Sequence, residues 1–201
     1  MKKGKLLILL LLVVVALVGC TSSLSVSRLK SSKQLDLSGN WNDTDIALVT
    51  KELVNSSLKT NWINDFRKGN RRDPVVVVGS ILNKSSEHID TAIIAKRFEM
   101  ALINTGRVEM VADVDFRDQV RTEREEQQYY ASEKSASALG QELGADFILQ
   151  GAVRTVVDQI EGKATRTYYV SAELINIETS RKVWVGEHSI KKLIQQQRFG
   201  W

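Results

Sequence analysis

The first feature of the chain is a single long apolar run near its start. An uncharged stretch from Leu6 to Gly19 follows three lysines that lie among the first five residues. A basic segment, an apolar segment and a small residue, in this order, are typical of a secretory signal. The apolar stretch has about 14 residues, fewer than the roughly 20 that a membrane-spanning helix needs. We therefore expect a cleaved signal rather than a transmembrane helix.

After residue 40 the hydrophobic positions take the period of a helix. Asp43-Thr44-Asp45 is a good helix start, and Ile46, Val49 and Leu53 then fall on one face. We expect this helix to continue to about Phe66.

The pattern then changes to that of strands. The unbroken β-branched run at 75–81, directly after Pro74, predicts a strand that is buried on both faces. Asp90 is placed to cap a second helix, Gly106 to end it, and the segment 108–111 to form a short second strand.

The second half of the chain begins with helical periods and ends with strands. Two helices are predicted, at 113–130 and 135–143, and three strands, at 147–158, 165–176 and 182–190. The tail from Lys191 to Trp201 shows no clear period. The whole pattern predicts an α/β (α+β) fold, with a mixed sheet of about four to five strands packed against about four helices.

Composition narrows the class of protein. The 201 residues carry a formal charge of +4, and removal of the three lysines in the signal lowers it to +1. Such a balance gives no support to nucleic-acid binding. The hydrophobic content of 43% fits a packed core.

The one cysteine, Cys20, ends the run Leu17-Val18-Gly19-Cys20. This run resembles the lipobox of bacterial lipoproteins, which implies cleavage between Gly19 and Cys20 and a diacylglycerol on the thiol. Thr21 and Ser22 follow without an aspartate, which resembles sorting to the outer membrane. We expect the mature chain to be bound to that membrane, on its periplasmic face, through the lipid.

These features divide the chain into three parts. Residues 1–19 are the expected signal peptide, 20–40 are the lipidated cysteine with a serine-rich flexible tether, and 41–201 are the globular domain.

A search for reactive groups finds no pattern of an enzyme. His88 and His188 lie about 100 residues apart with no second ligand at metal-binding spacing. The chain has no Gly-x-Ser-x-Gly nucleophile motif and no phosphate-binding or dinucleotide-binding glycine motif. We expect no catalytic residue, no metal, no cofactor and no small-molecule substrate.

The best candidate for binding is the polar loop after the first strand. Ligand sites collect at the carboxyl ends of strands, and loops often carry function. A capped connection without any partner explains the same residues. The loop consists of Asn83, Lys84, Ser85, Ser86, Glu87 and His88.

Three longer stretches together resemble a known family. They lie at 75–111, at 139–151 (Leu-Gly-Gln-Glu-Leu-Gly-Ala-Asp-Phe-Ile-Leu-Gln-Gly) and at 174–184 (Leu-Ile-Asn-Ile-Glu-Thr-Ser-Arg-Lys-Val-Trp). They look like the LpoB family of outer-membrane lipoproteins that activate penicillin-binding proteins. The last two also recur in CsgG-type secretion lipoproteins and in the amino-terminal domain of TolB, whereas the helix start at Asp43 and the loop at Asn83 favour LpoB.

The resemblance implies a fold like the TolB amino-terminal domain and a role without catalysis. A protein of this family binds a regulatory domain of a class A penicillin-binding protein and stimulates peptidoglycan synthesis allosterically. The alternative is an envelope assembly or secretion lipoprotein of the CsgG and TolB kind. The tether here departs from the best-known pattern of the family, because it is short and has no proline before residue 74.

Overall fold

The computed structural model describes residues 25–30, 33, 35–112, 117–123 and 144–195. Residues from Leu35 onward belong to one compact unit, and those up to Gln34 belong to another. The expected cleavage site and Cys20 lie outside the described residues, as does the helix predicted at 135–143. Within the described residues, no helix is both long enough and apolar enough to cross a membrane.

A five-stranded mixed sheet forms the centre of the unit, in the order β2-β1-β3-β4-β5. The strands are β1 (Val75–Lys84), β2 (Glu109–Met110), β3 (Phe147–Ile160), β4 (Lys163–Asn176) and β5 (Lys182–Gln195). Strand β1 pairs in parallel with β2 and β3, whereas β3, β4 and β5 form an antiparallel meander. The predicted mixed sheet of four to five strands is therefore confirmed.

The described helices are α2 (Asp43–Leu58), α3 (Trp62–Asn70), α4 (Thr91–Ile103) and a helical segment at 117–123, which lies within the helix predicted at 113–130. Asn42 and Asp45 cap the start of α2 reciprocally, each side chain accepting from the backbone N–H of the other. Asp90 caps α4 as predicted, and Gly106 follows that helix with φ of +62°.

The single helix predicted from Asp43 to Phe66 is wrong, because the chain forms two helices there. The carbonyl of Ser57 accepts from the Thr60 hydroxyl at 2.7 Å and from the Trp62 indole N–H at 3.1 Å. These side chains take up a carbonyl at the end of α2, where helical partners run out. The chain then turns and starts α3.

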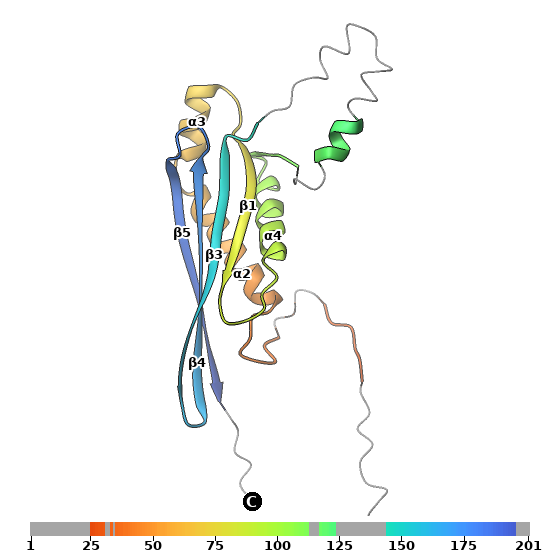
Figure 1. The fold of residues 1–201 in the computed structure, drawn as a ribbon, viewed down its shortest axis with the longest axis vertical. Coiled ribbons are helices and arrows are strands. Elements are labelled where there is room, and N and C mark those ends of the chain that lie inside the picture. Colours follow the sequence, from red (N-terminus) through yellow and green to blue (C-terminus); the bar gives the residue numbers. More distant parts are fainter. Residues whose placement is uncertain (1–24, 31–32, 34, 113–116, 124–143, 196–201) are drawn as a thin grey trace, which may run out of the picture. The chain divides into compact units, whose positions relative to one another are not determined.

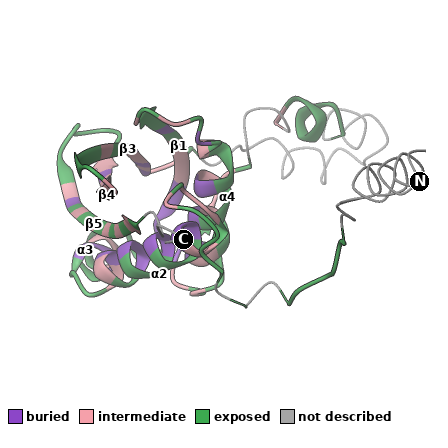
Figure 2. Ribbon diagram, turned by 90° about the horizontal axis from the view of Figure 1, so that it is seen from below, coloured by how far each residue is buried: buried purple, intermediate pink, exposed green. Residues whose placement is uncertain are grey.

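The helices α2 and α4 lie on one face of the sheet (Figure 1). Buried residues gather where these helices meet the strands (Figure 2), and Val49, Ile94, Phe98 and Tyr168 are among those with no exposed surface. Alternate side chains of each strand point into this core.

The opposite face of the sheet has no covering layer among the described residues. The prediction that the first strand is buried on both faces is therefore wrong: Ser80 and Leu82 of β1 are exposed. Four consecutive valines resemble a strand between two helical layers, but both packed helices lie on the same side. We call this uncovered surface the open face.

The tail predicted to lack a period forms part of β5. Lys192 and Ile194 pair with Arg166 and Ala164 of β4 and point to the helix side, whereas Lys191 and Leu193 are exposed on the open face. The meander consequently extends well beyond the ends of α2 and α4 (Figure 1).

Candidate functional site

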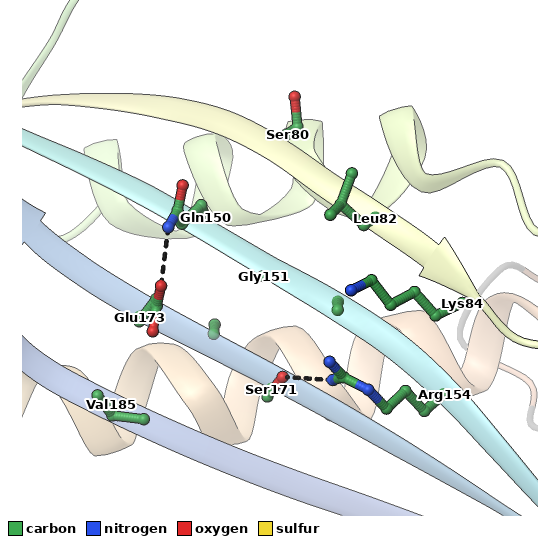
Figure 3. A pocket seen from close by; sticks show the side chains of 11 residues that line it. Ser80, Leu82, Lys84, Gln150, Gly151, Arg154, Ser171, Glu173 and Val185 are labelled. Atoms are coloured by element: carbon green, nitrogen blue, oxygen red, sulfur yellow. Dashed lines mark hydrogen bonds between the residues drawn. The ribbon is translucent and has the colours of Figure 1, made fainter.

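The open face contains a groove of about 280 Å³ across β1, β3, β4 and β5. Figure 3 shows the side chains along it, which are mostly polar. The labelled lining residues are Ser80, Leu82, Lys84, Gln150, Gly151, Arg154, Ser171, Glu173 and Val185. A Cβ on Gly151 would collide with the carbonyl oxygen of Ser171, so glycine lets β3 and β4 come together at the floor of the groove.

Two cations stand side by side at one end of the groove. Lys84 of β1 and Arg154 of β3 occupy paired positions in the parallel register, and both are exposed. Arg154 donates weakly to the Ser171 hydroxyl at 3.4 Å (Figure 3). Neither cation belongs to an ion pair that the structure shows within its described residues. This end of the groove therefore offers two positive charges to a partner.

The acid in the groove is already neutralised. Lys182 contacts Glu173 at 2.5 Å, and Gln150 donates to the other oxygen of the same carboxylate at 2.7 Å. The hydrogen bonds from Lys182 and then Gln150 lower the pKa of Glu173. The net positive charge near Lys84 and Arg154 is therefore not cancelled, and the groove is suited to bind an acidic surface with some apolar area.

The loop predicted to bind a partner is bonded mostly to itself. The Asn83 amide donates to the Glu87 carbonyl at 2.8 Å and accepts from the Ser85 hydroxyl at 2.6 Å. Lys84 alone among these residues lines the groove. Ser86 and His88 are exposed but do not line the groove. Partner binding by this loop stays a prediction. Of its residues, Lys84 is the best placed to contact a partner in the groove.

Glu87 turns inward from the loop instead of facing solvent. Its carboxylate accepts from the Tyr168 hydroxyl at 2.6 Å and from the Trp41 backbone N–H at 3.1 Å, and it lies 2.9 Å from an Arg166 nitrogen. Burial, and then the hydrogen bond to Glu87, raises the pKa of Tyr168. The phenol therefore stays protonated and donates to the carboxylate.

A second set of charged side chains lies next to Glu87 and Arg166, on the same side of the sheet. The Lys192 ammonium lies 2.7 Å from Asp45 and 2.9 Å from Asp36, and it donates to the Asn40 carbonyl at 2.9 Å. Burial alone would lower the pKa of Lys192, but the two carboxylates raise it. We call Asp36, Asp45, Glu87, Arg166, Tyr168 and Lys192 the ionic cluster.

The ionic cluster holds the segment that leads into the globular domain. The Gly39 carbonyl accepts from Tyr168 at 3.0 Å and from Arg166 at 3.3 Å, and Arg166 also contacts the Asn40 side chain. Trp41 packs edge-on against the Tyr168 ring, with the ring centres 5.2 Å apart. The cluster therefore attaches this segment to β4.

The described residues contain no group of three histidine, cysteine, aspartate or glutamate side chains that could hold a metal ion. His88 lies in the loop and His188 on β5. The open face has a shallow groove with two exposed cations, and exposed aliphatic side chains.

Comparisons with known proteins agree with the resemblance. The family model described as peptidoglycan-synthase activator LpoB matches residues 45–190. No curated protein gives a significant match.

Solved structures are similar at low identity. The LpoB C-terminal domain from Escherichia coli is 16% identical, with 74% of this chain and 99% of that chain covered and a TM-score of 0.47. The corresponding domain from Salmonella enterica is 13% identical, with the same coverage and a TM-score of 0.40. Lipoprotein GNA1162 from Neisseria meningitidis is 15% identical, with 64% of this chain and 88% of that chain covered and a TM-score of 0.39.

Proposed function

The chain belongs to the LpoB family of peptidoglycan-synthase activators, and from this premise we propose that it binds a class A penicillin-binding protein and activates it allosterically. The observation that carries the proposal is the family match over residues 45–190, which spans the sheet and the helices packed on it. The protein itself supplies no catalytic group in this scheme.

Activation of this kind requires a difference in affinity. The activator shifts the synthase toward its active conformation only if it binds that conformation more tightly than the resting one. We place the contact on the open face, where Lys84 and Arg154 flank the groove and Leu82 and Val185 are exposed by 51% and 60%. The partner's complementary surface is then acidic, with an apolar centre.

We further propose that the mature chain is held at the outer membrane by lipid on Cys20. The support is the sequence Leu17-Val18-Gly19-Cys20 after an apolar signal. Several acyl chains give a firm anchor, because each buried CH₂ contributes about 0.8 kcal/mol. The whole scheme places the domain in the periplasm, facing the cell wall.

The direct test is a binding and activity assay with the class A penicillin-binding proteins of the same cell. We expect saturable binding to at least one of them and faster glycan polymerisation in the same sample. No binding and no change in rate with any of these synthases would contradict the proposal. A closed ring of copies of this chain, without a synthase, would instead support an assembly role.

Reversal of the two groove cations tests where the partner binds. In the double variant Lys84→Glu and Arg154→Glu we expect affinity for the synthase to fall at least about tenfold, because charges that attracted an acidic surface now repel it. The matched control is Lys51→Glu, which reverses an exposed charge on α2, on the helix side of the sheet. Equal loss in the control, or no loss in the double variant, would move the contact away from the groove.

A further inference from the structure

The protruding end of the meander carries large aliphatic side chains that nothing covers within the described residues. They are Val156, Val157, Ile160 and Leu193, with exposed fractions of 56%, 44%, 74% and 63%. We call these four residues the apolar tip. All four lie in the half of the meander next to the turn between β3 and β4. That end of the meander extends past α2 and α4 (Figure 1).

The apolar tip faces both sides of the sheet. Val156 pairs with Thr167, and both lie on the open face, as do Ile160 and Leu193. Val157 pairs with Arg166, whose side chain points to the helix side. Packing against the core accounts for apolar residues on one face of a strand. Exposed apolar residues on both faces of a projecting hairpin instead indicate that the end of the hairpin contacts another apolar phase or surface.

The chain enters the folded unit at the same end. Lys192 binds Asp36, and Arg166 and Tyr168 bind the Gly39 carbonyl. All three binding residues lie in the half of the β4–β5 pair next to the turn between β3 and β4. Fifteen residues, 21–35, separate Cys20 from Asp36. Such a segment spans at most about 55 Å when extended and about 22 Å on average when flexible. A lipid on Cys20 therefore keeps this end of the domain close to the bilayer.

From these observations we propose that the apolar tip inserts into the interfacial region of the lipid bilayer that holds the anchor. The inference rests on the proposed lipidation of Cys20. Four aliphatic side chains give weak binding alone, but the anchor supplies them at a high local concentration. A second copy of the chain is a poorer occupant, because a stable protein interface needs about 800 Å² from each partner and the apolar tip is only four side chains.

The charges around the apolar tip also favour a neutral lipid surface. Arg166 and Lys192 beside the apolar tip are paired with carboxylates of the ionic cluster. Outside that cluster, Asp158 and Glu161 carry negative charge and Lys163 and Lys191 positive charge, so these formal charges cancel. Attraction to anionic lipid would need a surplus of lysine or arginine. We therefore expect the contact to form on zwitterionic lipid and to depend little on salt.

Fluorescence quenching in vesicles tests the insertion. The protein is purified from membranes with its lipid and reconstituted in phosphatidylethanolamine and phosphatidylcholine vesicles, some of which carry nitroxide-labelled lipid. A polarity-sensitive fluorophore is attached in the variant Ile160→Cys, since the acylated Cys20 does not react. The matched control is Glu178→Cys, which places the same fluorophore on the exposed turn at the far end of the meander.

We expect quenching at position 160 to exceed that at position 178 several-fold. With the fluorophore instead at Leu193→Cys, a second change of Ile160→Glu should reduce quenching severalfold, while Glu178→Lys should leave it unchanged. Equal quenching at 160 and 178 in protein that floats with the vesicles would overturn the insertion while leaving the anchor intact.

The remaining outcomes are also decisive. A fluorescence change at position 160 that follows protein density instead of nitroxide content would assign the apolar tip to a second copy and overturn the inference. Failure of the protein to float, together with a free thiol on Cys20, would overturn the lipid anchor itself and the insertion that rests on it.

Discussion

Replacement of Lys192 by methionine is expected to lower the free energy of unfolding by about 3–5 kcal/mol. The Lys192 side chain is only 10% exposed, and its ammonium lies 2.7 Å from Asp45, whose side chain is 3% exposed. Methionine keeps most of the apolar stem but removes the charge, so a buried carboxylate is left without its cation. Urea unfolding at neutral pH measures the loss.

The matched control is Lys191→Met, on the adjacent residue of β5. Lys191 is exposed on the open face, so its replacement should change stability by less than about 0.5 kcal/mol. In the Lys192 variant, burial without the cation should raise the pKa of Asp45 further above its unfolded value. The defect should then be largest at neutral pH and shrink as the pH falls and Asp45 is protonated. Equal stability of both variants would show that the ion pair has no net effect.

Replacement of Asp146 by asparagine is expected to cost about 1.5 kcal/mol at neutral pH, the lower end of the range for hydrogen bonds to charged groups, because the Arg72 side chain is partly exposed. The carboxylate receives two hydrogen bonds from Arg72, both at 2.7 Å, and one from the Val75 backbone N–H at 2.8 Å. It thus ties the start of β1 to the start of β3. Asparagine can still accept from Val75, but it loses the charge that faces Arg72.

The same carboxylate makes part of the stability dependent on acid. Burial alone would raise the pKa of Asp146, but the Arg72 guanidinium and the Val75 N–H hold it below its ordinary value. Its stabilisation is therefore complete above the unfolded pKa of about 3.9 and is lost as the pH falls through the lower folded value. The gap between wild type and Asp146→Asn should narrow over that range. The exposed Asp158→Asn is the control and should show no gap.

The sequence predicted best those features that depend only on residues within one helix or strand. The strands, the helix start at Asp43-Thr44-Asp45 and the cap at Asp90 could be predicted because alternation and capping are local properties. The burial of β1 could not, because it depends on which side of the sheet each helix packs. The break between α2 and α3 was also missed, since it follows from side chains that bond the Ser57 carbonyl.

The candidate site was only partly predictable for the same reason. The loop after β1 drew attention to Lys84, but Arg154 becomes its neighbour only through the parallel register of β1 and β3. Glu87 looked like a solvent-facing loop residue, yet its partners Tyr168 and Arg166 lie some eighty residues further on. Two adjacent lysines, Lys191 and Lys192, give no sign in the sequence of which one is buried.

The order in which the strands follow one another bears on how the chain folds. Strands β3, β4 and β5 are consecutive and joined by short turns, whereas β1 reaches β3 only across the segment 85–146. Contacts between near neighbours form earlier, because closing a long loop costs more entropy. Pulsed hydrogen exchange during refolding should therefore protect amides of β4 before those of β1, and simultaneous protection would contradict this order.

The meander that we expect to fold first follows β1 and the helices α2, α3 and α4 in the chain, so it is synthesised after them. If the chain is exported with its amino terminus first, the strands β3, β4 and β5 therefore cross the membrane after β1 and the helices. Until β3, β4 and β5 are present, β1 lacks its partner strand β3 and α2 lacks the strand β5 on which it packs. Late folding of this kind keeps the leading part extended, which is the form a narrow export channel can pass.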